Sequence, residues 1–192
     1  MTRVLCVALV LAAAGVDCAS AAEPALVDLM RELASVPRAR ARFTETKHVA
    51  LLKAPLTLTG TLSYERPDRL EKHVLAPYDE RIAIAGTQVT VDNNTRGRTQ
   101  NVSVASNPTL LALVESLRAT LAGDLAALER HFEVTLERKA DQWTIALVPR
   151  EAGTLALITR ISLTGSGNRL RRIDIEEAGG DRSEMSIQDD TR

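Results

Sequence analysis

Residues 56–64, LTLTGTLSY, alternate between apolar and small polar side chains along their whole length. The leucines and Tyr64 fall on one side of an extended chain, whereas the threonines and Ser63 fall on the other. Alternation with a period of two is typical of a β-strand that has one face in the core and one in water. The segment therefore predicts a sheet with a single apolar face, which another part of the chain has to cover.

Further segments with strand character follow in both directions from this one. Turn residues such as Pro77, Asp79 and Gly86 separate them, and a Gly-rich turn lies at 165–168. The spacing of 8–12 residues is typical of one large antiparallel sheet or barrel. The predicted strands, about ten in number, cover residues 38–45, 56–64, 69–75, 81–85, 87–92, 132–138, 143–148, 155–164, 169–176 and 184–188.

Two stretches have the apolar stripe of an amphipathic helix instead. The first contains Leu26, Leu29, Met30 and Leu33 and ends before Pro37. The second begins at Asn107-Pro108, ends at Gly123, and is followed by a short continuation over 125–130 that Asp124 caps. The apolar stripe of this second helix consists of Leu110, Leu111, Val114, Leu117 and Leu121.

A closed barrel would need no helix, whereas these apolar stripes must cover something. The predicted fold class is therefore mainly β with an α lid: a single antiparallel, incompletely closed β-barrel (half-barrel) capped by short helices. This shape encloses an apolar cavity, with the second helix as its lid. The predicted cavity lining consists of Leu56, Leu58, Leu62, Tyr64, Leu70, Val74, Ile82, Ile84, Val89 and Val91.

The N-terminal sequence predicts an export signal. Arg3 precedes a short apolar run over 4–16, and the small residues at 19–22 offer cleavage sites. Residues 1–22 are thus a predicted signal peptide, and residues 23–192 a single domain. Cys6 and Cys18 both lie in the signal peptide, so its cleavage would leave the domain without cysteine. A lipoprotein anchor on Cys18 is the alternative, and the acidic Asp17 before it disfavours this reading.

Composition argues against several functions. The 24 basic and 25 acidic residues give a net charge of −1 without a block of one sign, so nucleic acid is not an expected partner. His48, His73 and His131 lack metal-ligand spacing, and no metal or cofactor is expected. No catalytic constellation is evident, and we expect no enzyme. The carboxylates that could form an acid/base pair are assigned to solvated strand faces: Glu45, Glu65, Glu71 and Glu80.

The order of these parts resembles the LolA-type outer-membrane lipoprotein carriers. The resemblance rests on the strand Gly60-x-Leu62-x-Tyr64, the step Arg66-Pro67, the turn at Ala76-Pro77, the hairpin over 132–148, and the distal strands with Ile161-x-Leu163 and Ile173-x-Ile175. It implies a half-barrel with a helical lid in the periplasm. It also implies that Arg66, at the family's lid-locking position, hydrogen-bonds to the helical lid and holds the empty cavity shut.

Two departures from that family affect the expected cargo. Only 3% of the residues are aromatic, and the chain stops soon after Gln188, where the principal carriers continue into a further strand. The sequence therefore favours a divergent relative that handles a lipoprotein or another lipid-linked product. We expect a monomeric periplasmic carrier with acylated cargo, an inner-membrane donor and an outer-membrane acceptor. The alternative is a binding module that senses lipids or lipoproteins and acts on a partner protein.

Overall fold

A computed structural model of the chain describes residues 22–104 and 107–190, so residues 1–21 of the predicted signal peptide (1–22) lie outside the described residues. The described part contains four helices and eleven strands. The elements are α1 (Ala22–Ala34), β1 (Arg38–His48), β2 (Leu56–Glu65), β3 (Arg69–Ala76), β4 (Glu80–Ala85), β5 (Gln88–Asn93), β6 (Arg98–Ser103), α2 (Pro108–Ala122), α3 (Leu125–His131), β7 (Phe132–Lys139), β8 (Gln142–Pro149), α4 (Ala152–Leu155), β9 (Ile158–Ser166), β10 (Arg169–Glu177) and β11 (Arg182–Asp189).

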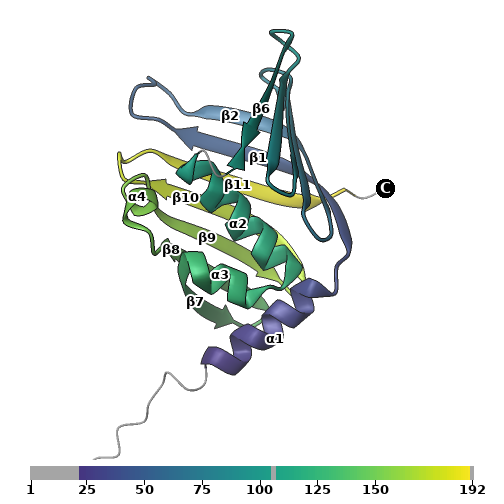
Figure 1. Cartoon of the computed structure of the whole chain (residues 1–192), viewed down its shortest axis with the longest axis vertical. Helices are drawn as coiled ribbons and strands as arrows, with labels where there is room; N and C mark the ends of the chain where they lie inside the picture. Colours follow the sequence, from purple (N-terminus) through teal and green to yellow (C-terminus); the bar gives the residue numbers. More distant parts are fainter. Residues whose placement is uncertain (1–21, 105–106, 191–192) are drawn as a thin grey trace, which may run out of the picture.

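All eleven strands belong to one antiparallel sheet, with the order β6-β5-β4-β3-β2-β1-β11-β10-β9-β8-β7 (Figure 1). Strands that follow each other in the chain are paired, except β6 and β7, which form the two edges of the sheet; in addition, the first strand pairs with the last. In that pairing Phe43 lies opposite Ile187 and Glu45 opposite Met185. The sheet thus consists of two meanders joined at β1 and β11. It does not close on itself, which confirms the predicted half-barrel.

Helices α2 and α3 lie across one face of the sheet, and α1 lies at its lower end in the view of Figure 1. The predicted stripe of α1 is buried, with Leu29 fully inaccessible to solvent. The Asn107 side chain accepts a hydrogen bond from the N–H of Leu110 at 3.0 Å, and Pro108 follows at the first turn, where its missing N–H costs nothing. The helix boundaries read from the sequence are therefore confirmed.

Helix α2 ends where it meets α1. Gly123 has a φ of 70°, which favours glycine, and an added Cβ would stand 2.3 Å from the carbonyl oxygen of Met30 in α1. Asp124 then caps α3 by accepting a hydrogen bond from the N–H of Ala127 at 2.9 Å. A glycine at this point lets the two helices approach each other closely.

The apolar core is divided into two clusters. The larger one joins α1 and α3 to the inner faces of β1, β2 and β7–β11, with Trp143, Ile145 and Leu163 among its buried members. The smaller one joins Val89 and Val104 to Val114 of α2. Helix α2 contributes side chains to both clusters, so it bridges them across the concave face of the sheet.

Two local predictions are wrong. Strand β6 was not predicted, because Arg98–Ser103 has no apolar alternation; as an edge strand exposed along most of its length, it needs only main-chain pairing with β5. The predicted strand over 155–164 begins instead at Ile158. The residues before it form the short helix α4, where the Thr154 hydroxyl donates to the Glu151 carboxylate at 3.1 Å.

Candidate functional site

A cavity of about 680 Å³ lies between the concave face of the sheet and α2. Ligand pockets in proteins usually measure roughly 300–1,000 Å³. Along β1 its lining residues lie between Arg38 and His48, with a gap over 42–44; these ten residue steps, at about 3.2–3.4 Å each and less in a twisted strand, span roughly 30 Å. The lining is mainly aliphatic and comes from strands of both meanders. The site is therefore an elongated apolar channel roofed by one helix.

Half of the predicted lining residues do face this cavity: Leu62, Tyr64, Leu70, Ile82 and Ile84. On the roof, Leu110, Val114, Leu117 and Leu121 of α2 also line it. Their positions follow from register, because Leu62 lies opposite Lys72 and Lys72 opposite Ile82 across three neighbouring strands. Residues on one face of paired strands form such rows.

The structure corrects the other predicted lining positions. Leu56, Leu58 and Val74 pack in the larger core cluster, and Val89 and Val91 in the smaller one. On α2, Leu111 packs in the smaller cluster and does not line the cavity. These residues share the inner face of the sheet, but neighbouring side chains cover them. Alternation identifies the face of a strand, and packing then decides which positions on that face border open space.

Sequence reasoning missed the half of the lining that the distal strands supply. The missed apolar residues are Leu33 and Val36 at the end of α1 and just after it, Ala39 and Ala41 of β1, Val49 after β1, Leu113 of α2, Ile158 and Ile161 of β9, Leu170, Ile173 and Ile175 of β10, and Met185 and Ile187 of β11. Their alternation was visible in the sequence. What was not visible is the pairing of β1 with β11, which brings these strands beside β2 and β3.

One charged group in the cavity wall contradicts the sequence interpretation. Glu45, assigned to a solvated face, is only 3% exposed and forms an ion pair with Lys72 of β3. The Ser183 hydroxyl of β11 donates to its other carboxylate oxygen at 2.6 Å. The alternation of β1 places Glu45 on the same face as Phe43, which is the inner face. This polar bridge connects β3, β1 and β11 across the floor of the cavity.

The pKa values of the pair follow from this environment. Burial by itself would raise the pKa of Glu45, but the charges of Lys72 and Lys47 and the hydrogen bonds from Lys72 and Ser183 outweigh it and hold the pKa below its ordinary value. Burial lowers the pKa of Lys72, and the Glu45 carboxylate opposes that shift. Glu45 is therefore an anion near neutral pH, with its charge already satisfied.

Gly60 lets the main chain of β3 and the Phe43 ring approach β2 closely. A Cβ on Gly60 would stand 1.9 Å from the carbonyl oxygen of His73 and 2.9 Å from the Phe43 ring. The Lys72 ammonium lies 5.1 Å from the centre of that same ring, a distance suited to a cation–π contact. The glycine in the Gly-x-Leu-x-Tyr strand thus helps to position the ring over which Lys72 lies.

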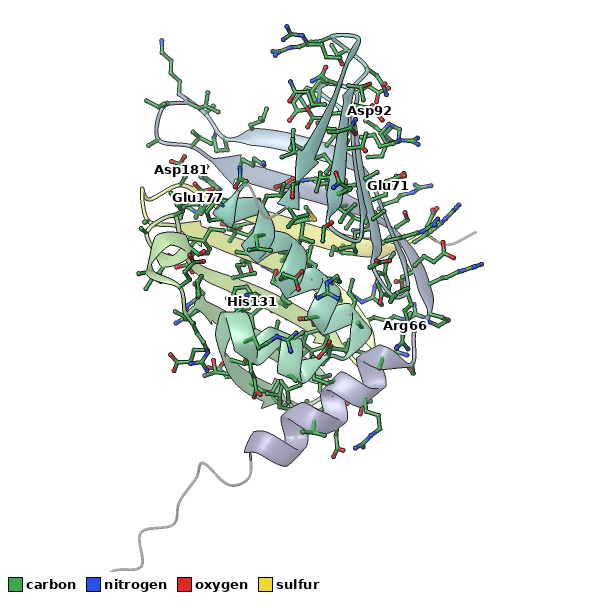
Figure 2. The ribbon with its side chains drawn as sticks, in the orientation of Figure 1. Arg66, Glu71, Asp92, His131, Glu177 and Asp181 are labelled. Atoms are coloured by element: carbon green, nitrogen blue, oxygen red, sulfur yellow. The ribbon has the colours of Figure 1, made fainter. Side chains whose placement is uncertain are left out.

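Arg66, the predicted lid-locking residue, lies beside the end of α1 (Figure 2). Its guanidinium donates to the backbone carbonyl of Ala34, the last residue of α1. Its side-chain hydrogen bond is therefore with α1 and not with α2, the helix predicted as the lid. Cations are favoured at a helix C-terminus, where backbone carbonyls lack partners.

Tyr64 lies near Arg66 in the cavity wall. Burial raises the pKa of this phenol, although the charges of Arg66 and Arg118 oppose the shift. Within the described residues, its buried hydroxyl has no hydrogen-bond partner. A neutral phenol with an unused donor is thus part of a mainly aliphatic lining.

The histidines do not come together. His73 contacts the Asp79 carboxylate at 2.9 Å and His48 lies 3.9 Å from the Glu184 carboxylate, while His131 ends α3. Over residues 22–104 and 107–190, no three histidine, cysteine or acidic side chains form a group that could hold a metal ion. None of the described helices is long and apolar enough to cross a membrane.

Comparisons with known proteins give the context of this site. No curated protein matches the chain. Solved structures with a similar fold include a LolA superfamily protein from Nitrosomonas europaea, with 10% identity, a TM-score of 0.47, and coverage of 88% of this chain and 92% of that one. A lipoprotein-sorting protein domain from Vibrio parahaemolyticus, described as putative, gives 8% identity, a TM-score of 0.44, and coverage of 86% and 92%.

A third similar structure is the MucA/MucB complex of Pseudomonas aeruginosa, with 16% identity, a TM-score of 0.40, and coverage of 85% of this chain and 55% of that one. These likenesses concern the fold alone. The family comparison goes further, because the model described as "Outer membrane lipoprotein carrier protein LolA-like" matches residues 18–188, nearly the whole chain. The protein is thus a divergent member of the LolA-like family of outer membrane lipoprotein carrier proteins.

Proposed function

We propose that the protein is a periplasmic carrier that binds the acyl chains of a lipoprotein or another lipid-linked molecule and moves this cargo towards the outer membrane. The observation that supports the proposal most strongly is the aliphatic cavity of about 680 Å³ under α2. Its length of about 30 Å along β1 is comparable to the hydrocarbon thickness of a bilayer, also about 30 Å. An extended acyl chain therefore has room along the channel.

The energetics of transport make such a cavity necessary. Each buried methylene contributes about 0.8 kcal/mol, so exposing a chain of about 16 carbons to water costs on the order of 10 kcal/mol. A carrier has to offset most of this cost without binding so tightly that release fails. Aliphatic walls contribute through area and impose no directional contacts, which suits a flexible chain.

We infer no chemistry of its own for the protein. A general acid in such a site would need a carboxyl group whose pKa is raised towards neutrality. Of the carboxylates that line the cavity, Glu45 is the buried one; its pKa has the opposite shift, and Lys72 and Ser183 hold the carboxylate in place. The donor and acceptor of the cargo are expected to be proteins or membranes on either side of the periplasm.

The test is to recover cargo from protein that has been exported and purified. Denaturing extraction and mass spectrometry should find acyl species in near-stoichiometric amount with the wild type. Ala41 faces the cavity opposite Leu62, so Ala41→Phe should fill the channel and abolish recovery. The matched control is Thr44→Phe on the outer face of the same strand, which should leave recovery unchanged.

Arg66→Leu provides an independent measurement. This variant removes the hydrogen bond to the end of α1, which packs against the end of the roof helix α2 at Gly123. We expect it to retain more acyl cargo than the wild type, because α1 is then held less firmly against the sheet and supports the closed roof less well. Recovery of no acyl species from either the wild type or Arg66→Leu would contradict carriage. In that case a protein that co-purifies with the chain would favour the lipid- or lipoprotein-sensing module instead.

A further inference from the structure

Exposed leucines gather on the loops at one end of the sheet. Among the described residues, six large apolar side chains are strongly exposed, and four of them are Leu51, Leu52, Leu155 and Leu157. Leu51, in the loop between β1 and β2, is 95% exposed. Single exposed leucines are common, but four of six in neighbouring loops indicate an interaction surface.

Backbone hydrogen bonds hold these loops together. The N–H of Ala50 donates to the Asp181 carboxylate at 2.8 Å, which ties the β1–β2 loop to the β10–β11 turn. The N–H of Ala178 in that turn donates to the carbonyl oxygen of Leu157 at 3.0 Å. Residues 49–55, 155–157 and 178–181 therefore form one continuous edge, which we call the leucine rim (Figure 1).

The leucine rim adjoins the cavity. Lys47, His48 and Val49 at the end of β1 line the cavity, as do Asp181 and Arg182 at the start of β11. Figure 2 shows Asp181 and Glu177 at this same end, remote from Arg66 and α1. The channel thus reaches the rim, and any surface that contacts the rim stands next to the end of the channel.

We propose that the leucine rim docks on a lipid bilayer, with Leu51 and Leu52 entering the boundary between headgroups and acyl chains. The inference rests on the proposed carrier function, because docking would place the channel where acyl chains enter or leave it. Leu51 protrudes almost completely from its loop, and a bilayer can accept such a side chain without a matching pocket. The exposed Lys53 of the rim favours a surface with anionic headgroups, while the rim's one carboxylate, Asp181, accepts the hydrogen bond from the N–H of Ala50.

Two leucines give weak, reversible attachment. Burial of one leucine side chain changes a partition coefficient by about tenfold or more, and even a single acyl anchor holds a protein only marginally at a membrane. A carrier needs this kind of contact, because it must leave each membrane after exchange. A permanently anchored protein could not cross the periplasm with its cargo.

The test is co-sedimentation of the purified protein with vesicles of phosphatidylethanolamine and phosphatidylglycerol. We expect binding by the wild type, about tenfold weaker binding by Leu51→Ser, and a further loss when Leu52→Ser is added. The matched control is Val27→Ser in α1, because Val27 is 41% exposed, close to the 48% of Leu52, but lies far from the rim. Vesicles of phosphatidylcholine alone should bind more weakly, since they lack the negative charge.

A depth measurement identifies the contact directly. Trp143, the only tryptophan, is 2% exposed and should not respond to vesicles. In the variant Leu51→Trp, the fluorescence of the introduced tryptophan should therefore shift to the blue when vesicles are added and should be quenched by brominated lipids. In the variant Val27→Trp, neither change is expected. Equal binding of wild type and rim variants, or no binding of the wild type, would overturn the proposal. In the second case, a protein captured by the wild type and lost with Leu51→Ser would assign the rim to a protein partner.

The carrier function can be judged separately with the same proteins. Rim variants leave the cavity lining intact, so they should take up a fluorescent fatty acid from solution as the wild type does. If uptake persists while vesicle binding is insensitive to the rim, the docking proposal alone fails. If the wild type takes up no fatty acid, the carrier function itself fails.

Discussion

The ion pair between Glu45 and Lys72 offers the sharpest test of the cavity floor, through the variants Lys72→Met and Glu45→Gln. Removing Lys72 leaves a carboxylate that is 3% exposed without its closest counter-ion. Removing the Glu45 charge leaves a lysine side chain that is 22% exposed above an aromatic ring. Each change thus leaves a desolvated charge without its partner.

The expected magnitude follows from burial and from the remaining contacts. Breaking a buried ion pair costs about 3–5 kcal/mol of unfolding free energy. Glu45 keeps the Ser183 hydroxyl at 2.6 Å and Lys47 at 3.7 Å, so we expect Lys72→Met to lie at the lower end, about 3 kcal/mol. Lys72 can reach solvent in part, and Glu45→Gln should cost about 2–3 kcal/mol.

Urea denaturation at neutral pH measures these differences, and the double variant measures the coupling. With both charges removed, neither is left buried alone, so the double variant should be more stable than the sum of the two losses predicts by about 2–3 kcal/mol. In thermal unfolding, these single losses correspond to a decrease in Tm of about 4–12 °C for a chain of this length. Lys139→Met, on an exposed strand end, should change the free energy by less than about 0.5 kcal/mol.

The pH dependence of stability provides a second test of the ion pair between Glu45 and Lys72. The pKa of Glu45 is lower in the folded protein than its ordinary value of 4.5. Its charge therefore stabilises the fold fully above pH 4.5, and this contribution is lost as the pH falls through the folded value. The difference in unfolding free energy between wild type and Glu45→Gln should therefore become smaller below pH 4.5. The buried ion pair between Glu45 and Lys72 would be refuted if the stability losses of the two single variants add up to the loss of the double variant. It would also be refuted if the stability difference between wild type and Glu45→Gln does not change as the pH falls.

Three further changes test the packing around the site. Gly60→Ala would place a methyl group 1.9 Å from the His73 carbonyl oxygen, and we expect a loss of about 3 kcal/mol or failure to fold in urea titrations; a loss below 0.5 kcal/mol would contradict this. Asp124→Ala should cost about 1 kcal/mol by removing the cap of α3, while Asp124→Asn should restore most of it. Trp143→Phe removes the indole N–H bond to the Gly167 carbonyl at 2.7 Å and should cost about 2 kcal/mol, measured by circular dichroism.

Local patterns in the sequence were sufficient for most elements of the fold. Alternation over residues 56–64 predicted β2 with its correct inner face, and the signals Asn107-Pro108 and Gly123 placed both ends of α2. These predictions succeed because alternation, capping and turn formation depend on residues that are close in the chain. The polar edge strand β6 has no such signal, since pairing at an edge requires no apolar face.

The functional site depends on contacts that the sequence alone does not specify. The pairing of β1 with β11 joins residues about 140 positions apart, brings the distal strands to the cavity, and places Ser183 beside Glu45. The sequence predicts Glu45 as a surface carboxylate because its residue type is rarely buried. Its burial becomes possible through Lys72, Lys47 and Ser183, which other parts of the sheet bring to it.

The sequence by itself thus determined the fold class and the family, through periodicity and the order of its parts. Tertiary structure decided which residues of the inner face border the cavity, where the charges in its wall are satisfied, and which loops meet at the leucine rim. The physical reason is that periodicity fixes the direction of a side chain relative to its own strand, whereas open space, ion pairing and loop contacts arise between segments that meet only when the sheet curls.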